Sequence, residues 1–258
     1  MNIIEANKVI VERYVIENHN YQNLIVGSSI SQGLPLDEKG LNISSLALTN
    51  GNAVTGLEVI YRSKKAPKNL YIEINSLVAK SNLGLYYDLE SNLLDFNFKM
   101  RFLEFREANK PLKLLFYIVQ ALSYKIKSFI PKTAIIPDKK PNYENLKKET
   151  IRQRLNIHDK PPGEELIERL NKLDTLIGLI LDFSSETNMF LFEAPMEESL
   201  LNSQQHVFIR EYCFDLIDKY NLETIELTKN IKYEFVDGVH LTPSSAGDFL
   251  EELAKKIK

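Results

Sequence analysis

The sequence is poor in the residues that mark several specialised classes of protein. It has a single cysteine, Cys213, among 258 residues, so no disulfide forms within the chain and no cysteine cluster can hold a metal. We expect this thiol to be buried and structural. Glycine and proline number only ten each, which excludes collagen-like and low-complexity chains. The composition is that of a globular protein with a substantial core.

Long apolar runs and an excess of one charge are also missing. No stretch reaches the ~18 consecutive apolar residues of a membrane span, and the first residues lack the basic start and apolar run of a signal peptide. We therefore expect a cytoplasmic location, or an envelope-associated one if an anchor has been removed. The chain has 32 Lys and Arg against 35 Asp and Glu, a net charge of −3, which provides no basic surface for nucleic acid.

Short apolar runs rich in β-branched residues alternate with amphipathic stretches along the chain. This alternation predicts a parallel sheet covered by helices on both faces. The predicted strands cover residues 23–27, 45–49, 69–74, 189–194 and 223–227. The predicted helices cover residues 3–18, 52–64, 112–130, 143–155, 164–182, 204–220 and 243–257. The expected fold is α/β, a three-layer flavodoxin-like domain that spans residues 1–258.

The third and fourth predicted strands are separated by residues 75–188, which is far longer than an ordinary crossover. We therefore predict a helical insertion over about 85–185. Within it, residues 110–130 place lysines between apolar residues and contain no acid. This pattern suits a core helix with solvated lysines, or a helix that makes peripheral contact with an anionic membrane. The Pro- and Lys-rich residues 131–163 are expected to form loops around a short helix, which makes them a candidate lid.

The first predicted strand runs into Gly27, Ser28 and Ser29 at its carboxyl end. Ligands of open α/β sheets bind at that edge, next to the point where the strand order reverses. A serine on a tight turn there can present its hydroxyl to a substrate carbonyl while backbone N–H groups face the developing oxyanion. The same three residues also make an ordinary turn and helix cap.

Asp237 and His240 stand three residues apart, just before the last predicted helix. A hydroxyl nucleophile needs a base within hydrogen-bond reach, and the base needs a carboxylate that holds its tautomer and stabilises the imidazolium. One turn of Asp-x-x-His can supply both groups. An Asp-Gly turn followed by a histidine that caps or packs is the better explanation of the motif when it stands alone, and the strand-end serine raises the weight of the catalytic interpretation.

Two further residues follow predicted strands. Asn75 ends the third strand, where a side-chain amide can donate to an oxyanion, and Gly51 follows the second, where glycine permits close approach of a backbone N–H. The alternatives are a strand-terminating asparagine and a turn glycine.

The order Ser, Gly, Asn, Asp-x-x-His along an α/β chain resembles the SGNH (GDSL-type) hydrolase superfamily. Four blocks carry the resemblance: Gly27–Ser29, Asn50–Asn52, Glu73–Ser76 and Asp237–His240. The short spacing of the first three and the long insertion are most similar to the bacterial branch of esterases and O-acyltransferases that act on envelope polysaccharides. Three positions depart from the family pattern, because Ser28 and Ser76 stand where it has aspartate and Glu73 where it has glycine.

The resemblance implies roles for the matching residues. Ser29 would be the nucleophile, His240 the general base and Asp237 its partner, while the N–H groups of Ser29 and Gly51 and the amide of Asn75 would bind the oxyanion. No metal or organic cofactor is implied, and the chain has neither a G-x-x-x-x-G-K-[ST] loop nor a G-x-G-x-x-G fingerprint. The expected partner is an acylated carbohydrate or another ester.

Several functions remain open at this stage. The expected one is a serine esterase or O-acyltransferase, and the residues do not distinguish water from a sugar hydroxyl as acceptor. The alternatives are a non-catalytic glycan- or protein-binding module of the same fold and a flavodoxin-like cofactor binder. The other histidines, His19, His158 and His206, share no metal-ligand spacing and are expected to be structural or surface residues. The oligomeric state is also left open.

Overall fold

A computed structural model describes residues 3–16, 21–36, 42–80, 143–227 and 231–257. Five strands form one parallel sheet in the order β2-β1-β3-β4-β5. They are β1 (Asn23–Val26), β2 (Ile43–Ser45), β3 (Asn69–Glu73), β4 (Asn188–Phe192) and β5 (Glu223–Ile225). The chain steps from β1 outward to β2 and then returns to β3, so the strand order reverses between β1 and β3.

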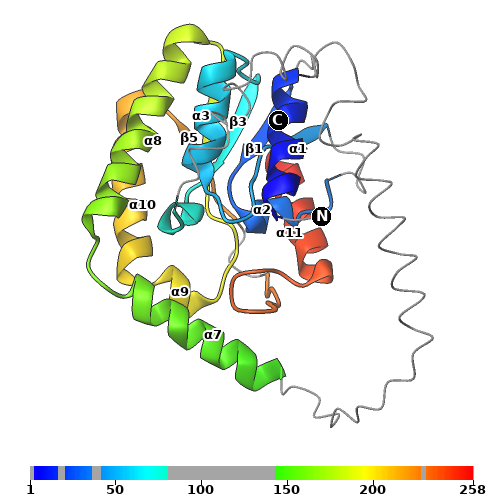
Figure 1. Ribbon diagram of the computed structural model, residues 1–258, viewed down its shortest axis with the longest axis vertical. Coiled ribbons are helices and arrows are strands. Elements are labelled where there is room, and N and C mark those ends of the chain that lie inside the picture. The colour runs from blue at the N-terminus through cyan, green and yellow to red at the C-terminus, as the bar shows by residue number, and fades with distance from the viewer. Residues whose placement is uncertain (1–2, 17–20, 37–41, 81–142, 228–230, 258) are drawn as a thin grey trace, which may run out of the picture.

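Helices cover both faces of the sheet (Figure 1). One layer holds α1 (Ile3–Ile16), α3 (Ala53–Ser63), α8 (Glu164–Phe183) and α10 (Gln204–Tyr220). The other layer is built by α2 (Ser29–Gln32) and α11 (Pro243–Lys256). The remaining elements are the 3-10 helix η2 (Asn75–Val78), α7 (Tyr143–His158) and α9 (Glu198–Leu201). The structure is therefore the three-layer, flavodoxin-like α/β fold that the sequence predicts.

The two faces of the sheet belong to two separate apolar clusters. In β1, Leu24 and Val26 contribute to the cluster under α1, α3, α8 and α10, whereas Ile25 contributes to the cluster under α11. β3 divides in the same way at Leu70 and Tyr71. Successive side chains of a strand point to opposite faces, and both faces here are buried, so the strands are continuous apolar runs.

The start of the helix predicted over residues 243–257 is confirmed, because α11 begins at Pro243. Thr242 precedes α11 with extended backbone, its Oγ1 accepts a hydrogen bond from the Ser245 N–H, and Pro243 is the first helical residue. A hydroxyl N-cap followed by proline is a strong signal for a helix N-terminus.

The predicted strand over residues 45–49 is wrong in its limits, because β2 begins earlier and ends at Ser45. Beyond β2 the chain still runs beside β1, since the Leu46 N–H donates to the Ile25 carbonyl (2.8 Å) and the Leu48 N–H to the Gly27 carbonyl (3.2 Å). The apolar run therefore identifies the segment that pairs with β1, but not the residues where regular pairing begins and ends.

Only part of the predicted insertion can be compared with the structure. The predicted helix over residues 112–130, and with it the candidate membrane segment 110–130, lies outside the described residues. In the described part, α7 confirms the helix expected from residue 143 and extends it to His158. α8 packs against α3 and contributes Leu170 and Ile177 to the core, so it is the crossover helix between β3 and β4. No helix in the described ranges is long and apolar enough to cross a bilayer.

Candidate active site

The turn after β1 presents Ser29 at the carboxyl edge of the sheet. Ser28 has extended backbone and caps α2, with its Oγ accepting a hydrogen bond from the Ile30 N–H (3.2 Å). Ser29 is therefore the first helical residue, and it is only partly buried. The first N–H groups of a helix have no acceptor within the helix. The Ser29 N–H is therefore not used by the hydrogen bonds of α2.

Ser29, His240 and Asp237 form one hydrogen-bonded chain. The Ser29 Oγ lies 2.8 Å from His240 Nε2, and His240 Nδ1 lies 2.9 Å from Asp237 Oδ2. These distances allow His240 to accept the serine proton at one nitrogen while the other nitrogen donates to the carboxylate. The structure thus brings together the three residues that the sequence selects for covalent chemistry.

Asp237 is held by more than the imidazole. Its Oδ1 accepts the backbone N–H groups of Val239 (3.1 Å) and His240 (2.8 Å). Burial acts to raise the pKa of Asp237, but the hydrogen bonds from the His240 ring, the His240 N–H and the Val239 N–H outweigh it and hold that pKa below its usual range. The carboxylate is therefore ionised and oriented toward His240.

A second carboxyl group, Glu73, lies directly beneath the serine turn. It is fully buried at the end of β3 and accepts hydrogen bonds from the Ser28 N–H (3.1 Å) and the Ser28 hydroxyl (2.8 Å). The Ser31 hydroxyl donates to it as well. Burial raises the pKa of Glu73, while these hydrogen bonds act to lower it. A β-carbon at Gly27 would overlap the Glu73 carboxyl group, so glycine is required where β1 passes it.

The sequence marks Glu73 only as a departure from a family pattern and does not reveal this role. The available signal is an acid that directly follows the apolar residues 70–72 at the end of the fully buried strand Asn69–Glu73. A carboxyl group at such a position needs hydrogen-bond partners, and it finds them in the serines that follow β1.

The three predicted oxyanion donors differ in availability. The Gly51 N–H donates to the Leu48 carbonyl (3.0 Å) in a turn where Asn50 has a left-handed backbone (φ 55°). The Asn75 side chain pairs with the backbone of Ala194, with Nδ2 donating to its carbonyl (2.9 Å) and Oδ1 accepting from its N–H (3.1 Å). One amide hydrogen of Asn75 has no acceptor among the described residues.

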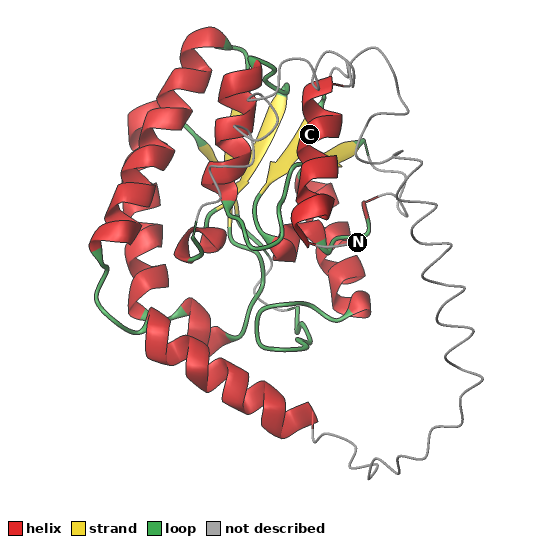
Figure 2. Cartoon of the chain, viewed as in Figure 1, coloured by secondary structure: helices red, strands yellow, loops and turns green. Residues whose placement is uncertain are grey.

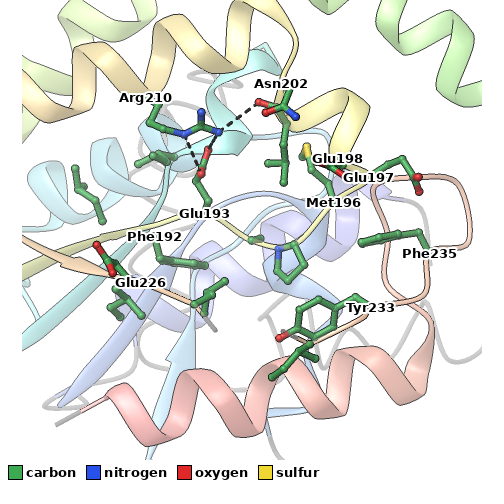
Figure 3. A pocket seen from close by; sticks show the side chains of 18 of the residues that line it. Phe192, Glu193, Met196, Glu197, Glu198, Asn202, Arg210, Glu226, Tyr233 and Phe235 are labelled. Atoms are coloured by element: carbon green, nitrogen blue, oxygen red, sulfur yellow. Dashed lines mark hydrogen bonds and ion pairs between the residues drawn. The ribbon is translucent and has the colours of Figure 1, made fainter. Parts of the chain in front are cut away.

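A cavity of about 1320 Å³ opens at the carboxyl ends of β4 and β5, between α9, α10 and residues 231–235. Figure 3 shows Phe192, Met196, Tyr233 and Phe235 around it, together with the ion pair of Arg210 and Glu193. The backbone links this wall to the candidate triad, because the Val236 N–H donates to the His240 carbonyl (2.8 Å). Ser29, Asp237 and His240 themselves do not line this cavity, which reaches the neighbouring residues 231–235 and Thr242.

Cys213, His158 and His206 are not part of the candidate triad. Cys213 is buried in α10, and burial, with a smaller contribution from Glu193, raises its thiol pKa to about 12. His206 is buried and contacts the ring of His158 edge-on, with 5.2 Å between centroids. His19 lies outside the described residues. Within the described ranges, no cluster of three or more His, Cys, Asp and Glu residues is arranged to hold a metal ion.

Comparison with known proteins yields distant similarities to several solved structures. No family model matches the chain, and no curated protein sequence does. A solved structure assigned as a platelet activating factor from Streptococcus pneumonia has a TM-score of 0.48 and 13% identity, covering 99% of this chain and 91% of that one. The periplasmic domain of a lipopolysaccharide acetyltransferase from Salmonella ser. Paratyphi A has a TM-score of 0.39 and 12% identity, covering 96% and 87%. At such identities the chemistry of this chain has to be argued from its own residues.

Proposed function

We propose that this protein is an SGNH-type serine esterase or O-acyltransferase that works through an acyl-enzyme at Ser29. The observation that carries the proposal is the hydrogen-bonded chain from Ser29 Oγ through His240 to Asp237, with links of 2.8 and 2.9 Å. A serine needs such a base to become a nucleophile, and the base needs an oriented carboxylate.

In the first half of the reaction, Ser29 Oγ attacks the ester carbonyl as its proton passes to His240 Nε2. Asp237 stabilises the imidazolium that forms, and its low pKa keeps it ionised for that task. When the tetrahedral intermediate collapses, the bond to the leaving alcohol breaks and His240 returns the proton to the alcohol oxygen. The second half repeats these steps, with water or a sugar hydroxyl attacking the acyl-serine.

The developing oxyanion needs donors close to Ser29. We assign this role to the Ser29 N–H and to the amide hydrogen of Asn75 that Ala194 does not accept, and each such donor is commonly worth about 3 kcal/mol in the transition state. The Gly51 N–H can donate to the oxyanion only when its hydrogen bond to the Leu48 carbonyl is broken. The proposed substrate is an acylated carbohydrate or envelope polymer, as the family resemblance implies.

The decisive experiment compares wild type with Ser29→Ala. Wild type should hydrolyse p-nitrophenyl acetate and become labelled at Ser29 by a fluorophosphonate, as read by intact mass. Ser29→Ala should lose the label and about 10³-fold or more of the turnover without unfolding. Ser244→Ala, at an exposed serine of α11, is the matched control and should behave as wild type. Equal turnover by wild type and Ser29→Ala would exclude the mechanism.

A second function is supported by one observation. The Gly51 N–H is occupied by Leu48 and the Asn75 amide is shared with Ala194, an arrangement that also fits a non-catalytic glycan- or protein-binding module with an inactive cleft. The same labelling experiment separates the two, because a binding module has no activated hydroxyl. A wild-type protein that binds glycans on an array and takes up no fluorophosphonate would establish the module instead.

A further inference from the structure

The carboxylate of Asp237 has a cationic partner that the catalytic chain does not include. Arg154, in α7, places its Nη2 3.1 Å from Asp237 Oδ2, the same oxygen atom that lies 2.9 Å from His240 Nδ1. The two side chains of this ion pair are only 32% and 25% exposed, so solvent and salt screen the pair incompletely. A fixed positive charge therefore lies next to the group that must stabilise the imidazolium.

The docking of α7 makes this contact specific. Lys147, Ile151 and Arg154 recur at helical spacing and share one face of α7. Lys147 lies 3.8 Å from the Glu197 carboxylate, and the Glu197 N–H donates to the Gly238 carbonyl (2.8 Å). Three successive positions on this face therefore meet the segments around the Asp237 turn.

Gly238 is the point of closest approach between α7 and that turn. It has a left-handed backbone (φ 88°), and a β-carbon there would lie 2.6 Å from Ile151 Cγ1. A side chain at Gly238 would be strained by the left-handed backbone and would have to displace the Ile151 side chain that packs there. Figure 1 labels α7 at the bottom of the view, and Figure 2 shows it there as a long helix beside the loop that precedes α11.

We propose that Arg154 is a positioning residue that shares the Asp237 carboxylate with His240 and thereby sets how far activity extends into acidic solution. The inference rests on the proposed function, which gives His240 that role. A guanidinium beside Asp237 takes up part of its negative charge and repels the imidazolium. Loss of the guanidinium would leave the whole carboxylate charge to the imidazolium, so activity should fail at a higher pH without Arg154 than with it.

The other charged groups near this pair do not replace Arg154. Lys147, also in α7, faces Glu197. The pKa of His158, at the end of the same helix, is lowered first by burial and second by the Arg154 guanidinium. From the turn itself, Glu234 is exposed, and Ser29 on the β1 side is neutral. Among the described residues, Arg154 is the cation paired with Asp237.

The test is the pH dependence of kcat/KM for p-nitrophenyl acetate in wild type, Arg154→Met and Arg154→Lys. Removing the charge should move the midpoint of the acidic limb upward by about 0.5–1 pH unit, and lysine should restore much of the wild-type position. Arg152→Met is the matched control, because Arg152 is exposed on the same helix and, within the part of the chain that the structure describes, forms its ion pair with Glu149 and not with Asp237. Its profile should coincide with that of wild type.

A purely structural role for Arg154 would lower kcat at every pH, or lower the melting temperature, and leave the midpoint in place; that result would overturn the inference. An NMR titration of the His240 ring, assigned with His240→Gln, gives the same midpoint without turnover. The NMR titration also distinguishes failure of this inference from failure of the proposed function. If the wild-type protein is inactive, the titration still tests whether Arg154→Met changes the behaviour of the His240 ring.

Discussion

At the scale of single residues, the site combines a predictable set of reactive groups with supports that are harder to predict. Ser29, Asp237 and His240 could be selected from the sequence, because a serine at a strand end and an Asp-x-x-His turn have a chemical meaning of their own. Glu73 could not, because its partners Ser28 and Ser31 lie more than forty residues away along the chain. Such a role becomes visible only once β1 and β3 are known to be neighbours.

Glu73 should be important for stability because it supports the turn that carries Ser29. Replacing it by alanine leaves the Ser28 N–H and two serine hydroxyls without their acceptor in a buried site, so we expect Glu73→Ala to lower the free energy of unfolding by about 2–4 kcal/mol. Glu73→Gln keeps an acceptor oxygen and should lose less. Urea denaturation measures both, and an unchanged midpoint for Glu73→Ala would contradict this account of the turn.

At the scale of elements, the pattern of apolar residues predicts which segments pack and leaves their contacts undefined. α11 was predictable to its first residue because Thr242 and Pro243 form a local signal. The part played by α7 was not, because Ile151 and Arg154 acquire meaning only when the helix docks on Gly238. The limits of β2 were missed for a related reason, since Leu46 and Leu48 continue the hydrogen bonds to β1 beyond the regular strand.

The contact of α3 with β1 depends on a missing side chain. A β-carbon at Gly56 would lie 2.8 Å from Val26 Cγ1, so Gly56→Ala should force the helix away from the sheet and lower the free energy of unfolding by about 1–3 kcal/mol. Gly247→Ala, inside α11, is the control, because no atom lies within 4 Å of its β-carbon. It should raise stability by about 0.5–1 kcal/mol through helix propensity. Thermal melts that shift in the same direction for both variants would refute this packing.

At the scale of the whole molecule, the crossover of the chain between β1 and β3 gathers the functional groups at one edge of the sheet. The fold class could be predicted because the alternation of strands and helices is strong and the two apolar clusters follow from strands buried on both faces. The cavity at the ends of β4 and β5 could not, because its walls come from β4, β5, α9, α10 and residues 231–235.

The buried histidine of α10 should make the stability of the molecule depend on pH. Burial first, and then the charges of His158 and Arg210, lower the pKa of His206 to about 3, against about 6.5 in an unfolded chain. Below pH ~6.5 the unfolded chain binds a proton that the folded protein does not accept until about pH 3, so stability falls as the pH drops through this window, by at most ~1.4 kcal/mol per pH unit.

This dependence can be isolated with one variant. Between pH 7 and pH 5, wild type should lose about 1–2 kcal/mol more unfolding free energy than His206→Gln, which cannot titrate in that range. Carboxylates titrate in both proteins, so the difference between the two curves belongs to His206. Parallel curves in urea denaturation at the two pH values would show that the ring is protonated in the folded state as well.

Ser29 and His240 are 211 positions apart in the chain, which affects when they can meet during synthesis on the ribosome. The segment that carries Ser29 leaves the ribosome before the segment that carries Asp237 and His240, so the hydrogen-bonded chain of the three residues cannot form until both segments have been made. The contact between Ser29 and His240 therefore forms only when the segment before α11 closes against β1. Two fragments divided between Ser29 and Asp237 would each lack part of the proposed triad, so turnover that appears only on mixing them would report that they had reassembled.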